Sequence, residues 1–209
     1  MEKSEIIEKK KLDKRLIVLF IVAIVALLVA IGTYLSTPIT KTKKREIIST
    51  SPQESFVFET IKGEKFKIDA SPQSFKISNM KNKIVFLKIF SWNCKYCKKE
   101  IPELINLKKQ FDGAFDIIAI ESESYTTKEN LQFAKERDIN YHIVTGDKYK
   151  KFFQYLKEHH GWSGVIPLSI VLGENGDILA FEVGAKSYTL AELLKVSLQQ
   201  YKIIQNLNK

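Results

Sequence analysis

The sequence predicts an α/β fold in which a central mixed sheet is flanked by helices, with an apolar N-terminal helix before it. After residue 54, short apolar runs rich in β-branched and aromatic residues alternate with amphipathic segments. This alternation ends in a hairpin and a helix, which indicates a mixed sheet. The 209 residues are 44% hydrophobic and 27% charged, so we expect one packed domain of ordinary size plus an appendage.

The appendage is a stretch without charged residues, 16–35, which is long enough to span a membrane as a helix. Six Lys and Arg residues precede it and four follow it, a bias that favours an N-terminus on the inside. We therefore predict a cytoplasmic N-terminus (1–15), a single-pass transmembrane anchor in the inner (cell) membrane, a linker (36–54) and a periplasmic or extracytoplasmic domain (55–209). A signal peptide cleaved at Ala30-Ile31-Gly32 is the alternative.

The expected strands are apolar runs bounded by turn-forming residues. The first two flank Lys62-Gly63-Glu64 and predict a hairpin. The third leads to the two cysteines and is expected to be buried, because it is an apolar run rich in β-branched and aromatic residues. The last two form a second hairpin around Asn175-Gly176-Asp177. The expected strands are 56–58, 65–68, 83–90, 115–120, 141–144, 168–172 and 178–183.

Helices are expected where apolar residues recur at spacings of three and four. The first follows the cysteines and contains Pro102, which is expected to kink it. The second has Thr127 as its predicted cap, and the third carries an aromatic patch that is typical of a core. The last carries a stripe of leucines on one face and closes the domain. The expected helices are 98–109, 127–137, 149–159 and 189–207.

The two cysteines of the chain, Cys94 and Cys97, lie at a predicted strand–helix junction with two residues between them. Such a pair can close into a disulfide and open again, so it can exchange two electrons without a bound cofactor. The unpaired N–H groups and the dipole at a helix N-terminus favour the thiolate of the first cysteine. We therefore predict that Cys94 is the attacking nucleophile and that Cys97, one turn further in, is the more buried resolving thiol.

Other roles for the pair are less favoured. A zinc site would need two more ligands, and His142, His159 and His160 do not stand at zinc-finger spacing, so no metal is expected. A disulfide that closes a four-residue loop constrains the unfolded chain little. A role as two inert thiols buried in a core is also less favoured, because lysines stand on both sides of the second cysteine. The net charge is +9, but basic-aromatic strips and helix-turn-helix signals are missing from the sequence, so nucleic acid is not an expected partner.

These motifs resemble the thioredoxin superfamily and, within it, the membrane-anchored TlpA/ResA-like thiol–disulfide oxidoreductases, over residues 55–200. The stretch Cys94–Pro102 is similar to that family's CxxC-K-x-E-x-P stretch. Val165-Ile166-Pro167 before a strand resembles the cis-proline loop of the superfamily, and Asn175-Gly176-Asp177 resembles the turn of its terminal hairpin. The resemblance implies a thioredoxin-like fold with a redox-active disulfide.

The resemblance also implies roles for residues around the pair. Pro167 would be cis and pack against the disulfide, leaving Ile166 to pair its backbone with substrate, although a trans proline fits the residues alone equally well. Glu100 would be a catalytic residue that relays protons or tunes the thiol pKa, or else a solvated acid of a first helical turn. The predicted substrate-binding residues are Trp92, Tyr96, Trp162, Ile166 and Pro167.

Two positions depart from the family pattern. Asn93 stands where the family usually has a Trp, and Lys95-Tyr96 stands where the second residue is commonly Pro. A Tyr before the second cysteine is more similar to periplasmic isomerases. These departures leave the direction of electron flow open.

Three alternative functions follow from the resemblance and from the thiol pair. The first is a membrane-tethered reductase of disulfides in exported proteins such as apocytochrome c, during cytochrome c maturation, supplied by a transmembrane electron-donor protein. The second is a periplasmic thiol oxidase or disulfide isomerase on the same fold. The third is a non-enzymatic tethered module that binds Cu(I) or a partner protein. A peroxidase is disfavoured because no Thr-x-x-Cys or Pro-x-x-x-Thr pattern precedes Cys94.

Overall fold

A computed structural model describes residues 24–27, 53–111 and 113–207. The chain divides into two compact units, Met1–Ser49 and Thr50–Lys209. Of the predicted anchor, residues 24–27 are described and are helical. The rest of the anchor and nearly all of the predicted linker lie outside the described residues. Within the described ranges, no helix is both long enough and apolar enough to cross a membrane.

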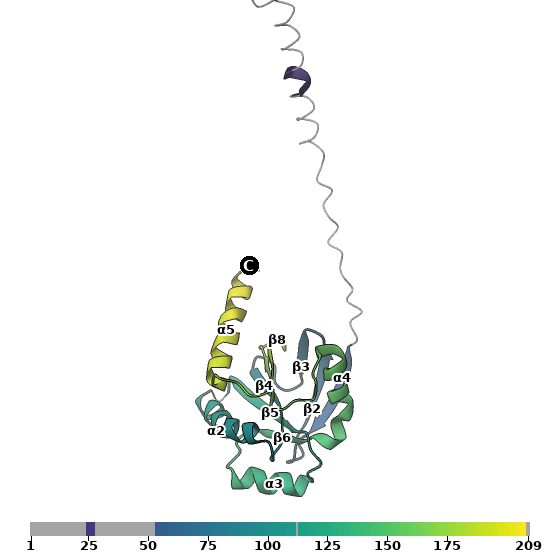
Figure 1. Ribbon diagram of the computed structural model, residues 1–209, viewed down its shortest axis with the longest axis vertical. Coiled ribbons are helices and arrows are strands. Elements are labelled where there is room, and N and C mark those ends of the chain that lie inside the picture. The colour runs from purple at the N-terminus through teal and green to yellow at the C-terminus, as the bar shows by residue number, and fades with distance from the viewer. Residues whose placement is uncertain (1–23, 28–52, 112, 208–209) are drawn as a thin grey trace, which may run out of the picture. The chain divides into compact units, whose positions relative to one another are not determined.

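A five-stranded mixed sheet forms the centre of the second unit, as predicted (Figure 1). Its strand order is β6-β5-β4-β7-β8. β4 pairs in parallel with β5, and β5 with β6, whereas β7 is antiparallel to both β4 and β8. The strands are β4 (Ile84–Phe90), β5 (Phe115–Glu121), β6 (His142–Thr145), β7 (Leu168–Leu172) and β8 (Ile178–Val183). The central position of β4 places its carboxyl end, which leads into Cys94, between β5 and β7.

A second, three-stranded antiparallel sheet contains the predicted N-terminal hairpin. β1 (Glu54–Glu59) pairs with β2 (Lys65–Ser71), and β2 pairs with β3 (Ser74–Ile77). The sequence did not predict β3. This strand has four residues and begins two residues after β2 ends, so its apolar pattern is too short to stand out from that of β2.

In the described part of the second unit, four α-helices and a short 3-10 helix, η1, accompany the sheets. The helices are α2 (Lys95–Gln110), α3 (Thr127–Glu136), η1 (Gly146–Tyr149), α4 (Lys150–His160) and α5 (Leu190–Leu207). α2 contains Pro102 in its interior, as predicted, and the carbonyl of Lys98, left without its usual N–H partner, belongs to an exposed residue that water can reach. The structure corrects the predicted cap of α3: it is Thr126, one residue before Thr127, in a reciprocal capping box with Glu129.

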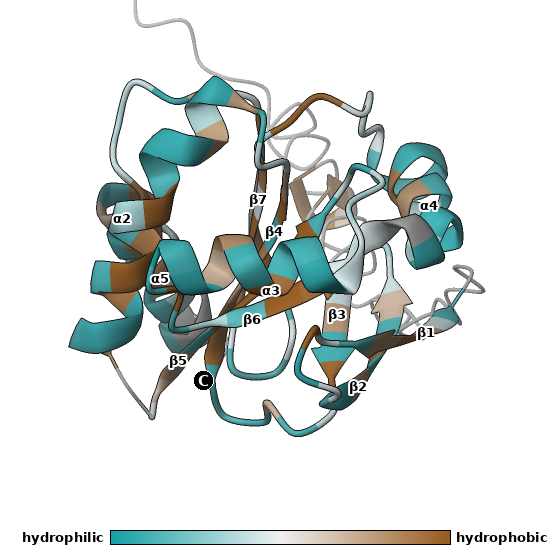
Figure 2. Cartoon of the chain, turned by 90° about the horizontal axis from the view of Figure 1, so that it is seen from below, coloured by the Kyte–Doolittle hydropathy of each residue, from teal (hydrophilic) through white to brown (hydrophobic). Residues whose placement is uncertain are grey.

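The central sheet separates two hydrophobic cores, because successive side chains of a strand point to opposite faces. The hairpin-side core lies between the sheet and β1–β3 with α4, and the cysteine-side core lies between the sheet and α2 with α5. Figure 2 shows β4 and β7 as largely hydrophobic strands between α2 and α4. The residues of β4 that belong to the hairpin-side core are Val85, Leu87 and Ile89. Those that belong to the cysteine-side core are Phe86 and Phe90, and Lys88 lies between them on the strand.

Candidate active site

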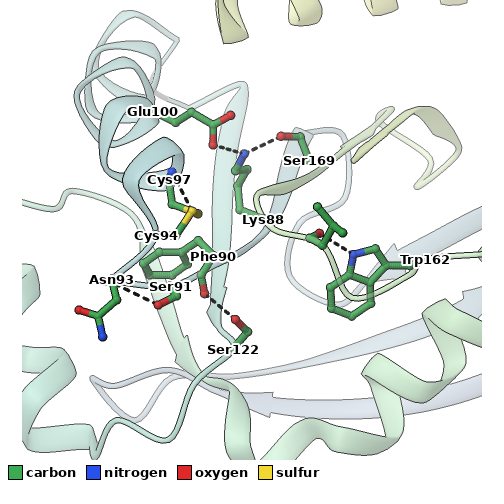
Figure 3. The surroundings of a disulfide bond; sticks show 11 residues. Lys88, Phe90, Ser91, Asn93, Cys94, Cys97, Glu100, Ser122, Trp162 and Ser169 are labelled. Atoms are coloured by element: carbon green, nitrogen blue, oxygen red, sulfur yellow. Dashed lines mark hydrogen bonds and ion pairs between the residues drawn. A yellow bond between two sulfur atoms is a disulfide. The ribbon is translucent and has the colours of Figure 1, made fainter. Parts of the chain in front are cut away.

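The two cysteines lie where β4 gives way to α2, at the N-terminus of that helix (Figure 3). Cys94 is the N-cap residue of α2, and its Sγ accepts a hydrogen bond of 3.1 Å from the backbone N–H of Cys97. The two sulfur atoms are paired in a disulfide, with 5.2 Å between the Cα atoms. Donors at the helix N-terminus face the sulfur of Cys94, which is the arrangement that stabilises a thiolate.

The two sulfur positions differ in accessibility. Cys94 is half-buried at the edge of the cysteine-side core, whereas Cys97 is buried within it. A substrate disulfide can therefore approach Cys94 more easily than Cys97. This asymmetry fits the predicted roles of attacking and resolving thiol.

Hydrogen bonds fix the turn between β4 and the first cysteine (Figure 3). The Oγ of Ser91 accepts from the backbone N–H of Asn93 at 3.0 Å, and the Ser91 carbonyl accepts from the N–H of Cys94 at 3.2 Å. Both the backbone N–H and the hydroxyl of Ser122 donate to the Phe90 carbonyl. The end of β4 is thereby tied to the segment after β5, which holds Cys94 in place.

The loop before β7 contains the cis peptide bond that the resemblance implied, between Ile166 and Pro167. The Pro167 carbonyl accepts a hydrogen bond of 2.8 Å from the N–H of Gly184. Leu168, the next residue, pairs with Ile89 of β4. The loop therefore lies beside the end of β4 that leads to the cysteines. It leaves Val165 half exposed, at 50%, a surface residue that sequence reasoning did not single out.

The two tryptophans among the predicted substrate-binding residues lie in the cores, which corrects that prediction. Trp92 is buried on the cysteine side, and its Nε1 donates to the Oδ1 of Asn130 at 2.7 Å. Trp162 is buried on the hairpin side, and its Nε1 donates to the Val165 carbonyl at 2.8 Å. Their rings are too covered to bind a protein substrate, so they support the loops of the site from beneath. A tryptophan whose ring N–H already donates to an acceptor within the protein is typical of a core.

Tyr96 lies between the cysteines and is 51% exposed, with the Nζ of Lys99 5.8 Å from its ring centre. Of the five predicted substrate-binding residues, Tyr96 therefore offers a large apolar surface beside Cys94. Ile166 is partly buried and packs against both cores, so a part of its side chain still faces outward.

Glu100 does not stand in solvent, and its partner is a buried lysine for which the sequence suggested no role. Lys88, on β4, is 1% exposed, and its Nζ lies 2.8 Å from the Oε2 of Glu100. The same amine donates to the Oγ of Ser169 on β7. Figure 3 shows this group of three next to the disulfide. The signal in the sequence was a single charged residue inside an otherwise apolar strand.

The electrostatics of this group follow from its burial. Burial lowers the pKa of Lys88, and the carboxylate of Glu100 opposes that effect. Burial also raises the pKa of Tyr141, to which the negative charge of Glu100 contributes. The described residues contain no cluster of three or more His, Cys, Asp or Glu side chains arranged to hold a metal ion. The chemistry available here is thiol–disulfide exchange with a carboxylate and an amine nearby.

Comparison with known proteins agrees with this geometry. A model of the AhpC/TSA family matches residues 59–181, which is more than half of the chain. A secreted thiol-disulfide isomerase from Corynebacterium glutamicum aligns with a TM-score of 0.55 and 17% identity, over 71% of this chain and 83% of that one. A DsbF homologue from Corynebacterium diphtheriae aligns with a TM-score of 0.52 and 20% identity, over 69% and 83% of the two chains. The fold is thus a thioredoxin-like α/β fold.

Proposed function

We propose that this chain, which belongs to the AhpC/TSA family and is a thiol–disulfide oxidoreductase, reduces disulfide bonds in exported proteins. The observation that carries the proposal is the difference in burial within the pair: Cys94 is accessible, and Cys97 is buried one turn later with a carboxylate and an amine behind it. The CxxC-K-x-E-x-P stretch, which resembles that of TlpA/ResA-like reductases, supports the reducing direction.

The reaction follows from the positions of the two thiols in the dithiol form. The Cys94 thiolate attacks a disulfide of the substrate, so one substrate sulfur leaves as a thiolate and a mixed disulfide forms. Cys97 then attacks Cys94, the second substrate sulfur leaves, and the Cys94–Cys97 disulfide closes. Two electrons pass to the substrate. A transmembrane electron-donor protein returns the enzyme to the dithiol.

The surface around Cys94 suits a protein substrate in an extended conformation. Tyr96 and Val165 are exposed apolar residues on the two segments that flank the disulfide. The backbone of Ile166, before the cis proline, is the predicted partner for the substrate chain. A substrate strand at this position would place one of its cysteines beside Cys94.

The proposed location and client extend the expectations from the sequence. The apolar segment 16–35 would anchor the chain, single-pass, in the cell membrane and hold the domain on its outer, periplasmic face. The proposed client is apocytochrome c before haem attachment, which needs both cysteines reduced. Secreted relatives of this fold, such as the isomerase from Corynebacterium glutamicum, support a site of action outside the cytoplasm.

Oxidation or isomerisation of exported proteins is the second candidate, and the N-cap position of Cys94 favours it. A thiolate stabilised by the helix N-terminus stabilises the reduced enzyme, and this raises the reduction potential. The Lys95-Tyr96 dipeptide, which departs from the pattern of the reductases, points the same way.

Trapping of mixed disulfides tests the proposed roles. A Cys97→Ala variant, expressed in the native membrane and quenched with a thiol-blocking agent, should accumulate disulfide-linked complexes with exported proteins. The matched Cys94→Ala variant should trap few. Equal trapping by the two variants would contradict the assignment of the nucleophile. Full biological function in a Cys94→Ala/Cys97→Ala double variant would instead favour a module that binds a partner protein without using its thiols.

A further inference from the structure

We propose that Lys88 is a positioning residue for disulfide exchange: it keeps Glu100 as a carboxylate behind Cys97, where that carboxylate accepts the thiol proton when Cys97 resolves the mixed disulfide. This inference rests on the proposed function. It adds Lys88 to the site and specifies that the proton moves from Cys97 to Glu100.

The register of the central sheet determines where the Lys88 side chain points. On β4, Phe86 and Phe90 belong to the cysteine-side core, so Lys88, between them in a period of two, faces the same side as α2. Ser169 is its Cα partner on β7, and its hydroxyl accepts a hydrogen bond from the amine. The hydrogen bond to Ser169 on the neighbouring strand therefore holds the amine of Lys88, and the side chain points towards α2 (Figure 3).

The spacing on α2 places Glu100 next to Cys97. Residues three apart on a helix share a face, with Cβ atoms about 5–6 Å apart. The side chain of Glu100 is 12% exposed and meets the amine of Lys88 at 2.8 Å. Water has little access to Cys97, so a proton leaving its thiol needs an acceptor inside the protein. Glu100 is a carboxylate at the right position on the helix.

Other titratable groups on the neighbouring elements interact with this pair. Glu103 lies one turn further along α2 and accepts a hydrogen bond from the backbone N–H of Leu190 at 2.8 Å. Lys186, before α5, pairs with Glu182 at 3.2 Å. Tyr141 lies in the segment before β6 and is buried. Among these groups, Lys88 is the one in direct contact with the Glu100 carboxylate, at 2.8 Å.

The step balances as follows. The S–H bond of Cys97 breaks and its proton passes to Glu100, while the Cys97 sulfur forms a bond with Cys94. The bond between Cys94 and the substrate sulfur breaks, and the substrate leaves as a thiolate. The two electrons that reduce the substrate come from the enzyme dithiol. Glu100 then releases the proton to solvent or to the departing thiolate.

The test separates the attack by Cys94 from the resolution by Cys97. The reduced full-length chain is mixed with an equimolar amount of 5,5′-dithiobis(2-nitrobenzoate) in a stopped-flow instrument, from pH 5 to pH 9. The first thionitrobenzoate reports attack and depends on concentration, whereas the second reports resolution and does not. Lys88→Met should slow the second phase on the order of 10²-fold at pH 7, because general-base assistance is worth about that much or more. The midpoint of its pH profile should move to higher pH, because the unpaired carboxyl holds its proton longer.

Three further variants keep the proposal falsifiable. Glu100→Gln should slow the second phase to a similar extent. Adding Lys88→Met to Glu100→Gln should slow it no further, and this double variant, which removes both buried charges, remains informative if Lys88→Met alone does not fold. Ile170→Val is the matched control: the residue is buried on β7 beside Ser169 but belongs to the hairpin-side core.

Two results would overturn the role of Lys88. One is a Lys88→Met protein whose second phase keeps the wild-type pH midpoint, as a purely structural role would give. The other is a double variant that is slower than Glu100→Gln by the full effect of Lys88→Met, because the lysine would then act independently of the carboxylate. A wild-type chain that releases no second thionitrobenzoate would overturn the proposed function, and this inference with it.

Discussion

The two faces of the central sheet pack against cores of different character. On the hairpin side, aromatic rings meet edge to face: Phe152 lies 5.2 Å from Phe58 and 5.9 Å from Phe75, measured between ring centres. On the cysteine side, the core contains a disulfide and a buried lysine paired with Glu100. The same strand, β4, contributes side chains to both cores, because its alternate residues point to opposite faces of the sheet.

The difference between the faces shows where stability and chemistry are placed. On the hairpin side, the buried carboxylate of Asp116 pairs with His142 and Lys83, whose side chains are partly exposed. The cysteine-side core accepts a charged pair in its interior, which an apolar core of the same volume would match or exceed in stability. Changes on the hairpin side should therefore reduce stability, and changes on the cysteine side should alter exchange.

The largest expected effect is that of Cys94→Ser. Thiol–disulfide exchange should fall to background in an assay of insulin reduction by dithiothreitol, because the remaining cysteine, Cys97, is buried. The free energy of unfolding should change little, since the disulfide closes a four-residue loop. Substantial residual exchange would show that Cys97 reacts directly with substrate despite its burial.

Phe152→Ala should give the largest loss of stability, about 3–5 kcal/mol in urea-induced unfolding, because it removes a fully buried ring. The reduction potential of the remaining folded protein should match that of the wild type. A shifted reduction potential would contradict the division between the two faces, since packing on the hairpin side would then also affect the chemistry of the disulfide. Phe86→Leu, which changes a buried ring on the cysteine side of β4, is the matched variant.

Asp116→Asn should lower stability by roughly 1–3 kcal/mol at pH 7, since it weakens charge-assisted hydrogen bonds. Burial opposes ionisation of Asp116, but hydrogen bonds from His142, Lys83 and the N–H of Ile117 hold the pKa of the carboxyl well below its usual range. Because the folded pKa is depressed, this contribution is complete above the unfolded pKa of about 3.9 and is lost as pH falls below it. The difference between variant and wild type in urea unfolding should shrink below about pH 4. A difference that persists unchanged at pH 3 would contradict the assignment.

Thr126→Ala should have the smallest effect, about 1 kcal/mol, from loss of the cap of α3. Thermal unfolding measures it, and both phases of the thiol assay should stay as in the wild type. Thr127→Ala is the matched control, because Thr127 is also exposed but does not cap the helix. If Thr127→Ala were the more destabilising of the two, the boundary of α3 would be wrong.

The sequence predicted the strands whose apolar pattern is complete within the strand itself. The runs 83–90, 115–120 and 168–172 became β4, β5 and β7 with boundaries within a residue, because a continuous apolar run bounded by turns is typical of a buried strand. The resemblance also pointed to the cis bond at Pro167, which the residues alone left open. β3 was missed because its existence depends on pairing with β2.

The parts of the site that were missed or misplaced depend on partners far along the chain. The burial of Lys88 requires Ser169, which lies 81 residues later, and nothing local indicates that contact. Trp92 was placed on a binding surface because its N–H partner, Asn130, lies 38 residues later in the chain. Trp162 is the exception: its partner, the Val165 carbonyl, is local, and its burial depends on the hairpin-side core around it. Charged and aromatic residues near a motif thus show that a site exists, but not which of them face the substrate.

The reduction potential of the Cys94–Cys97 disulfide tests the proposed reductase most directly. The full-length chain can be equilibrated in thiol–disulfide buffers of known potential, and its reduced fraction measured by alkylation and mass shift. The proposed function predicts a value near about −270 mV, close to that of thioredoxin. A value near about −120 mV would contradict it and establish the oxidising direction instead.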